Sequence, residues 1–271
     1  MRAIQRQPSR ASAPGSVLAY DIETIAPPQP DGSFPPWPTH RPVAIGFAVA
    51  RHAGGEWTFD LDALVVGGDT TEADLVRAAD VRMAATDITA SYNGRQFDAL
   101  VLRLSAQRLR IWDAPALADH AAAQRFGGEH ADLADLYSSY GRKVALAQLC
   151  DAIGIPAKTD VSGGDVAALW EAGETGRIRR YVLEDAVATL CLYCAWSAAR
   201  AGDEALVTRP VAALVRHIES RAELAHLQPF ADCALAHWCR PRALKADVAA
   251  VLARVTARLR REEDERAFAA S

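Results

Sequence analysis

Short apolar runs alternate with turn-forming segments in the first half of the chain, whereas apolar residues at helical spacing dominate the second half. Runs rich in β-branched and aromatic residues, bounded by turn residues, predict strands at 17–25, 43–51, 56–64 and 87–92, with a further short strand near 110–112. Apolar residues three and four positions apart predict helices at 70–84, 97–109, 113–125, 144–153, 163–173, 175–201, 206–227 and 244–269.

Turn and cap residues set the limits of these elements. Gly54-Gly55 joins two strands in a hairpin, and Thr70 or Thr71 supplies the N-cap of the first helix. Seven prolines between residues 26 and 42 exclude regular structure there. Glycines end the helices at 153 and 201, and Pro229 and Pro241 separate the last two helical segments.

This order of strands, alternating elements and final helices predicts an α/β domain with a mixed sheet flanked by helices. We expect a flexible tail at 1–16, a catalytic domain at 17–204 and a helical extension of unassigned role at 205–271. No internal repeat is visible.

Composition excludes several classes of protein. Of the 271 residues, 50% are hydrophobic and 24% charged, which excludes disorder for most of the chain. No uninterrupted apolar run is long enough for a membrane span. The net charge of −4 argues against a dedicated duplex-DNA binder. The charge is uneven, because the first 204 residues hold 26 acidic against 19 basic residues and the last 67 hold 8 against 11.

The five cysteines, an odd number without a signal-peptide pattern, favour reduced thiols and a cytoplasmic location. Cys191 and Cys194 have the spacing of half a zinc site, which Cys233 with His237 or Cys239 would complete. They lie in an apolar helical stretch, however, and buried structural thiols are the better interpretation.

Two carboxylates stand out in the first strand. Asp21 and Glu23 are two residues apart, so both side chains lie on one face of an otherwise apolar strand. A divalent cation would offset their mutual repulsion, while the alternative is a solvent-facing edge strand with ordinary acids. Asp98 begins a predicted helix, where an acid is stabilised by the helix dipole alone. Tyr181 and Asp185 share one face of the long helix at 175–201, and the alternative there is a core Tyr beside a surface Asp.

Taken in order, Asp-x-Glu, Asn-x3-Phe-Asp and Tyr-x3-Asp resemble the three exonuclease motifs of the DEDD superfamily, Tyr subgroup. The segments HisArgProValAlaIleGlyPheAla at 40–48, HisAlaAspLeuAlaAspLeu at 130–136, and those at 154–166 and 180–193 are similar to bacterial stand-alone exonucleases. These are related to the proofreading domain of B-family DNA polymerases. The resemblance covers about residues 17–200 and implies an RNase H-like fold with a mixed five-stranded sheet.

The resemblance implies a 3′–5′ exonuclease that hydrolyses phosphodiester bonds by a two-metal mechanism and acts in DNA repair. The matching metal ligands are Asp21, Glu23, Asp98 and Asp185, whose hard oxygen atoms suit Mg²⁺ or Mn²⁺. Two such ions would stabilise the attacking and leaving oxygens. Tyr181 would orient the attacking water.

The expected substrate is the 3′ end of single-stranded or frayed nucleic acid, with DNA favoured over RNA. We expect substrate contacts from Asn93, Phe97, Lys158, Ile22 and Thr24, although a turn, core packing or a solvated loop would equally explain the first three. An exoribonuclease is the close alternative. An alternative of another class is a non-catalytic interaction module that docks a protein partner through its C-terminal helices. The oligomeric state is not set by the sequence.

Overall fold

A five-stranded mixed sheet forms the centre of the protein, as seen in a computed structural model that describes residues 14–125, 129–138, 141–156 and 163–269. The strand order is β3-β2-β1-β4-β5. β2 runs antiparallel to β1 and β3, while β1, β4 and β5 are parallel to one another. The strands are β1 (Ser16–Ile25), β2 (Arg41–Ala53), β3 (Glu56–Val65), β4 (Ile88–Ser91) and β5 (His130–Asp132).

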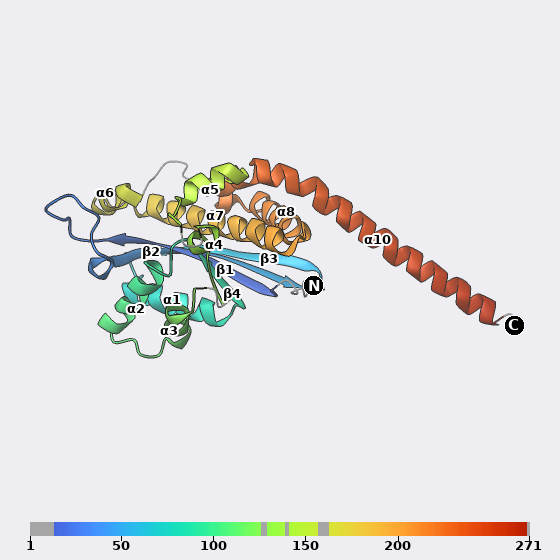
Figure 1. Ribbon diagram of the computed structural model, residues 1–271, viewed down its shortest axis with the longest axis horizontal. Coiled ribbons are helices and arrows are strands. Elements are labelled where there is room, and N and C mark those ends of the chain that lie inside the picture. The colour runs from blue at the N-terminus through green and yellow to red at the C-terminus, as the bar shows by residue number, and fades with distance from the viewer. Residues whose placement is uncertain (1–13, 126–128, 139–140, 157–162, 270–271) are drawn as a thin grey trace, which may run out of the picture.

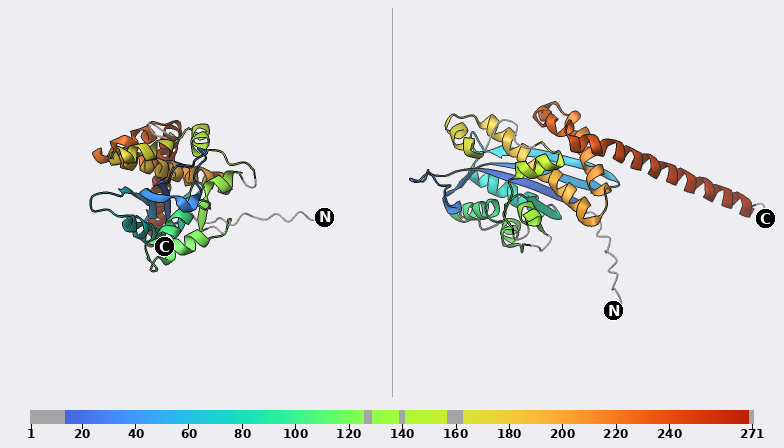
Figure 2. Two further views of the ribbon diagram at one scale, coloured as in Figure 1. Left: turned by 90° about the vertical axis from the view of Figure 1, so that its left-hand side faces the viewer. Right: turned by 45° about the horizontal axis from the view of Figure 1, so that its top comes forward.

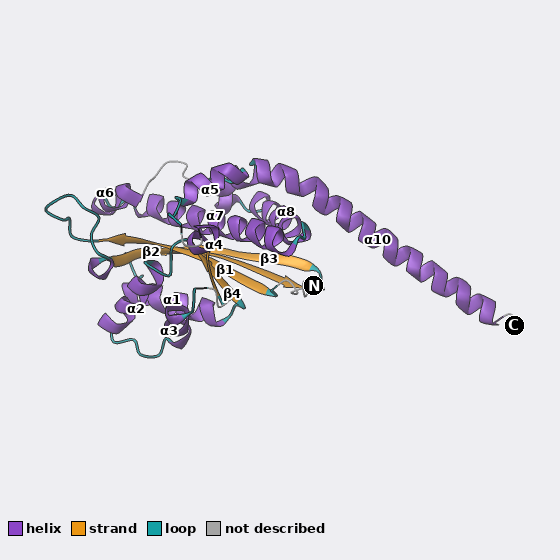
Figure 3. Cartoon of the chain, viewed as in Figure 1, coloured by secondary structure: helices purple, strands orange, loops and turns teal. Residues whose placement is uncertain are grey.

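Helices cover both faces of this sheet (Figures 1 and 3). One face packs against α1 (Glu72–Ala84), α2 (Asp98–Arg108) and α3 (Pro115–Ala122) in a core that contains Leu18, Tyr20 and Ile22. The other face packs against α7 (Thr175–Ala201) and α8 (Ala205–Glu219) in a core that contains Val17 and Ala19. Further short helices are α4 (Leu133–Ser138), α5 (Leu146–Ile153), α6 (Val166–Glu171) and α9 (Gln228–Ala231), with 3-10 turns at Trp37–Thr39, Gly163–Asp165 and Ala222–Leu227.

Helix α7 is the central helix of the larger core. Its length and composition would suffice to cross a membrane, but 61% of its most apolar window is buried inside the protein. It packs against β1, β2 and β3 and ends at Gly202, which adopts the left-handed conformation at φ 66°. Its apolar character is therefore explained by burial under the sheet.

The C-terminal part divides into a packed segment and a projecting one. Helix α8 lies on α7 and β3, and the first turns of α10 (Ala234–Ala269) lie on α8. The remainder of α10 extends away from the body of the protein as a single straight helix (Figure 2).

The fold prediction, an RNase H-like mixed five-stranded sheet flanked by helices with a C-terminal helical extension, is confirmed. Three local predictions are wrong. The fifth strand, expected near 110–112, is His130–Asp132. The segment 110–112 contains no strand, and Arg110 lies in a turn with φ 59°. The helix expected at 206–227 ends at Glu219 and is followed by a 3-10 turn. Pro241 does not interrupt the last helix, which begins at Ala234 and runs through it.

Candidate active site

The site is built on the central strand β1. Asp21 and Glu23 lie on the face of β1 that α7 covers, while the neighbouring Tyr20 and Ile22 point into the opposite core. The pairing of β1 with β2 shifts register between Glu23 and Thr24. Such a bulge redirects side chains at the end of a strand, and here it follows the second carboxylate directly.

A glycine on β2 brings the other half of the site close to β1. Gly46 pairs with Asp21 across the strands, and a Cβ at Gly46 would lie 2.2 Å from the backbone oxygen of Val182 in α7. Only a residue without a side chain permits this approach of helix to sheet. The contact point lies between Tyr181 and Asp185, so it sets both residues over β1.

Three carboxylates meet as a result. Oxygen atoms of Asp21, Glu23 and Asp185 all lie within 4.8 Å of one another. In the part of the chain that the structure describes, this is the one group of three or more His, Cys, Asp or Glu side chains that could hold a metal ion. The cysteines fall in no such group, and all five are free thiols.

Asp98 reaches the same strand from the open edge of β1. The parallel pairing of β1 with β4 covers only Val17 to Ala19. Beyond Ala19, the edge of β1 that faces β4 therefore has no paired strand among the described residues. The Asp98 carboxylate, which begins α2, accepts a hydrogen bond from the backbone N–H of Ile22, between Asp21 and Glu23. Asp98 is 5% exposed, and its position at a helix N-terminus favours the charged form.

Burial and like charge raise the pKa values of these acids. Burial raises the pKa of Asp98 to about 7, with a further contribution from Asp132. Burial also holds the pKa of Asp21 well above its usual range, and the nearby charges of Asp98, Asp185 and Glu23 add to this effect. Repulsion of this kind makes a fully ionised cluster unfavourable without a cation, and the oxygen donors are those that hard divalent cations prefer.

Tyr181 completes the arrangement from α7. Its hydroxyl donates a hydrogen bond to the carboxylate of Asp185, and the side chain is 5% exposed. Burial, followed by the negative charges of Asp185, Glu23 and Asp21, raises the pKa of the phenol. The hydroxyl is therefore protonated at neutral pH and serves as a hydrogen-bond donor.

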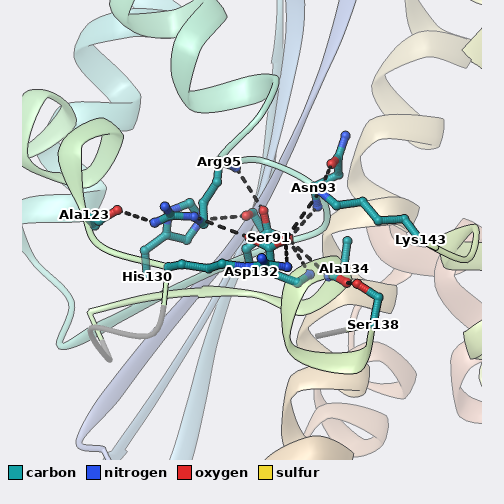
Figure 4. Close-up of polar contacts among 11 residues, drawn as sticks. Ser91, Asn93, Arg95, Ala123, His130, Asp132, Ala134, Ser138 and Lys143 are labelled. Atoms are coloured by element: carbon teal, nitrogen blue, oxygen red, sulfur yellow. Dashed lines mark hydrogen bonds and ion pairs between the residues drawn. The ribbon is translucent and has the colours of Figure 1, made fainter. Parts of the chain in front are cut away.

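A buried aspartate, Asp132, shapes the loop that leads to Asp98 (Figure 4). Its carboxylate accepts hydrogen bonds from the backbone N–H groups of Asn93, Arg95 and Ala134 at 2.9, 3.0 and 3.1 Å. The turn also requires Gly94, because a Cβ there would lie 2.4 Å from the Ser91 hydroxyl oxygen. Asp132 thus fixes the path of the chain from β4 into α2.

A second acid next to this loop, Asp135, is surrounded by cations. Its side chain is 3% exposed and forms ion pairs with Arg95 at 3.4 Å, Arg125 at 3.0 Å and Lys143 at 3.5 Å. Lys143 also donates a hydrogen bond to the side-chain oxygen of Asn93. Three basic side chains around one carboxylate leave a local excess of positive charge beside the loop.

An aromatic group lies at the end of β1 beyond Glu23. Phe34 stacks on His40 with ring centroids 4.9 Å apart, and the edge of His40 meets Phe97 at 4.9 Å. His40 is held by hydrogen bonds to Thr24 at 2.7 Å and to the carbonyl of Pro35 at 3.1 Å. Phe34 is 75% exposed, so its ring offers a flat apolar surface to solvent beside His40.

The predicted site residues divide into three groups. The structure brings together the four carboxylates and Tyr181. Of the expected substrate contacts, Asn93 forms the left-handed turn at φ 65°, Phe97 and Thr24 lie in the aromatic group, and Ile22 is buried in the core. Lys158 lies outside the described residues.

Sequence reasoning gave no role to Asp132, Asp135, Gly46 or Phe34. The two aspartates belong to the segment 130–136 that carries the family resemblance, so that segment could have drawn attention to them. Gly46 belongs in the same way to the segment 40–48, although its effect depends on which elements pack together, and Phe34 gave no signal.

A mixed sheet whose central strand carries paired carboxylates, with a third carboxylate on the covering helix, forms a site suited to a divalent cation. The chain belongs to the family described as "Predicted 3'-5' exonuclease related to the exonuclease domain of PolB", which matches residues 32–234. The match begins after Asp21 and Glu23, so their place in the site rests on the geometry above. No curated protein matches the chain.

Among solved structures, the family B DNA polymerase from the hyperthermophilic archaeon Pyrobaculum calidifontis is similar to this chain, with 18% sequence identity and a TM-score of 0.47. The similarity covers 77% of this chain but only 29% of the polymerase chain.

Proposed function

We propose that this protein is a metal-dependent 3′–5′ exonuclease that removes nucleoside monophosphates from single-stranded or frayed 3′ ends, with DNA as the favoured substrate. The observation that carries the proposal is that carboxylate oxygens of Asp21, Glu23 and Asp185 lie within 4.8 Å of one another. The Asp98 carboxylate is hydrogen-bonded to the backbone of the same strand at Ile22. Membership of the exonuclease family supports the same chemistry.

In this proposal Asp21, Glu23, Asp98 and Asp185 hold two divalent cations, Mg²⁺ or Mn²⁺. The donor set fits, because it consists of carboxylate oxygens whose pKa values are raised first by burial and then by neighbouring negative charge. Bound cations would lower the pKa of the attacking water and neutralise the charge that builds up on the phosphate.

Tyr181 positions the nucleophile in the proposed reaction. Its hydroxyl donates its one hydrogen to Asp185, and its oxygen accepts a hydrogen bond from a water molecule, which orients the oxygen of that water toward the phosphorus atom. The oxygen of that water forms a bond to phosphorus while the bond from phosphorus to the 3′ oxygen of the preceding nucleotide breaks. The products are a nucleoside 5′-monophosphate and a shortened strand with a free 3′ hydroxyl.

The aromatic group explains a preference for unpaired ends. Phe34 and Phe97 offer ring surfaces on which the terminal bases can stack, and such stacking requires bases that have left the duplex. Arg95 and Lys143 supply positive charge for backbone phosphates. No contact in this group distinguishes a 2′ hydroxyl, so an exoribonuclease remains the second candidate.

The remaining assignments are also proposals. We assign the catalytic domain to 17–204 and the helical extension to 205–271; the family match runs on to residue 234, and α8, the first helix of the extension, packs against α7 and β3. Free thiols throughout fit a reducing, cytoplasmic location. A role in DNA repair would follow from trimming of 3′ ends.

The test uses oligonucleotides labelled at the 5′ end, prepared as single-stranded DNA, duplex DNA with a frayed 3′ end, blunt duplex DNA and single-stranded RNA. With Mg²⁺ we expect ladders that shorten one nucleotide at a time, fastest on single-stranded DNA. Internal cleavage, or equal rates on blunt duplex, would contradict the proposed substrate. A faster ladder on RNA would favour the exoribonuclease.

A further inference from the structure

The outer part of α10 does not pack against the body of the protein. Up to Ala243 the helix carries buried side chains such as Leu235 and Cys239, but among the described side chains from Leu244 to Phe268 none is buried. We call residues 244–265 the arm. Figures 1 and 2 show the arm extending from the body with no other element beside it.

The arm carries a continuous apolar stripe. Each member has another member three or four positions away, and at 100° per residue all of them lie within an arc of about 100° on the helix surface. Each is about half exposed or more, from 49% for Val251 to 65% for Leu244. The stripe consists of Leu244, Val248, Val251, Leu252, Val255 and Leu259.

A helix with this composition is unstable when nothing covers it. The β-branched Val248, Val251 and Val255 lose side-chain freedom in a helix, and most helical stability in proteins comes from packing of the apolar face. The spacing of three and four residues is that of a coiled-coil seam. The stripe therefore needs a second helix along its whole length.

We propose that the partner is the same arm of a second copy of this chain, and that two arms pair antiparallel as a coiled coil. This dimer goes beyond the proposed nuclease function and does not depend on it. The arm is long enough for about three heptads, and each copy presents the same stripe, as a self-complementary twofold interface requires.

Charge selects both the second copy and the antiparallel direction. The seam of this stripe continues from Val255 to Leu259 and Glu262. A parallel pair in register sets each seam residue against itself, which stacks Glu262 on Glu262. Like charges at such positions are destabilising.

The antiparallel pair removes this conflict. When Leu252 lies opposite Val255 of the second copy, Val248 lies opposite Leu259 and Glu262 lies opposite Lys245. Residues 240–245 carry Arg240, Arg242 and Lys245 and no acid, whereas residues 262–265 are all acidic, so each tip meets an oppositely charged segment at the base of the second arm. Within one chain Glu262 pairs with Arg258 at 2.7 Å and with Arg266 at 3.8 Å, and in the proposed dimer Lys245 of the second copy adds a third cation across the interface.

The test measures the molar mass of the full-length protein by sedimentation equilibrium over a range of concentrations. We expect a dimer, and we expect Val251→Glu with Val255→Glu to raise the dissociation constant at least roughly a hundredfold, because two charges enter the seam. The matched control is Ala253→Glu with Ala257→Glu, which adds the same charges at the same spacing on the opposite face and should leave the dimer intact.

Both double variants should keep the melting temperature and exonuclease rate of the wild-type subunit, so failure of the dimer and failure of the nuclease assignment are distinguishable. A wild-type protein that is monomeric at its highest soluble concentration overturns the proposal. So does a dimer that persists in Val251→Glu with Val255→Glu, or one that the control disrupts equally.

A charge reversal tests the direction of pairing. Glu262→Lys with Glu265→Lys sets like charges against the base of the second copy and should weaken an antiparallel dimer several-fold. Adding Lys245→Glu should restore part of the affinity. An unchanged dissociation constant after the reversal overturns the antiparallel arrangement. In a parallel pair the substitutions would only replace contacts between two acids by contacts between two lysines, so the affinity would stay the same.

Discussion

Gly46 is the position where helix α7 comes closest to the sheet, and its replacement by alanine tests how the site is assembled. The added Cβ would lie 2.2 Å from the carbonyl oxygen of Val182 and 2.6 Å from its carbonyl carbon. Both atoms belong to the backbone of α7, so no side-chain rotation can relieve the contact. The helix and the strand must separate.

The size of the effect follows from this geometry. Ordinary contact begins at 3.4 Å, so α7 must move by about 1 Å relative to β2. Overpacking of this kind destabilises by about 1–3 kcal/mol. The same movement carries Tyr181 and Asp185 away from Asp21, and a misplacement of about 1 Å lowers a rate by about a hundredfold.

The assay combines kcat on a single-stranded oligonucleotide with the melting temperature of each variant. The control is Gly176→Ala in the same helix, because a Cβ at Gly176 meets no atom within 4 Å. We expect the control to retain full activity and stability. A Gly46→Ala protein with wild-type kcat and melting temperature would refute the close approach as the feature that assembles the site.

Three further predictions follow from the electrostatics and contacts of the site. In the absence of metal, the free energy of unfolding should decrease as the pH rises from about 4 to about 7, by about 1.4 kcal/mol per pH unit for one group. The reason is that Asp98, whose pKa in the folded state is about 7, holds a proton in this range that the unfolded chain has lost. Thermal melts in a chelator should show this slope, and Asp98→Asn should reduce it; a flat profile in the wild type would contradict the pKa assignment. Asp132→Asn should cost about 1–3 kcal/mol in a denaturant titration, since an amide group cannot accept every N–H that the carboxylate accepts; kcat should fall more than KM changes, and equal effects on both would argue against a role in placing Asp98. Phe34→Ala should leave the melting temperature unchanged, because the ring is 75% exposed, yet raise KM for single-stranded DNA roughly tenfold through lost stacking; an unchanged KM would remove Phe34 from the substrate path.

The elements of the central sheet were predictable because their signals are local. The strand at 17–25 and the helix at 175–201 differ from the observed β1 and α7 by at most one residue. The capping box at Thr71 and Asp74 also begins α1 where the sequence places the helix start. In each case apolar periodicity and cap residues agree with the tertiary packing.

The errors arose where tertiary context overrides local signals. The three-residue strand β5 is too short for a periodic pattern and exists because it pairs with β4. Pro241 lies within α10 although proline disfavours a helix interior. Its neighbours Cys239 and Ala243 are buried, so packing against α8 outweighs the lost hydrogen bond there.

The site was predictable in its residue types but not in its assembly. Spacing alone placed Asp21 and Glu23 on one face of a strand, and the motif order related them to Asp98 and Asp185. Contacts between elements distant in sequence determine the rest. Through them Gly46 allows α7 to approach the sheet, Asp132 fixes the loop before α2, and Phe34 stacks on His40. Such contacts leave no periodic pattern in the chain.

The most direct test of the central claim is the rate of nucleotide release from a 3′-labelled single-stranded DNA, measured against Mg²⁺ concentration for the wild type and for Asp185→Asn. The account predicts that release by the wild type rises with Mg²⁺ and stops in a chelator. It also predicts that the variant, which keeps the fold and the shape of the side chain, loses activity by orders of magnitude at every Mg²⁺ concentration. Release that continues in the chelator, or that the variant retains, would contradict a metal-dependent site at these carboxylates.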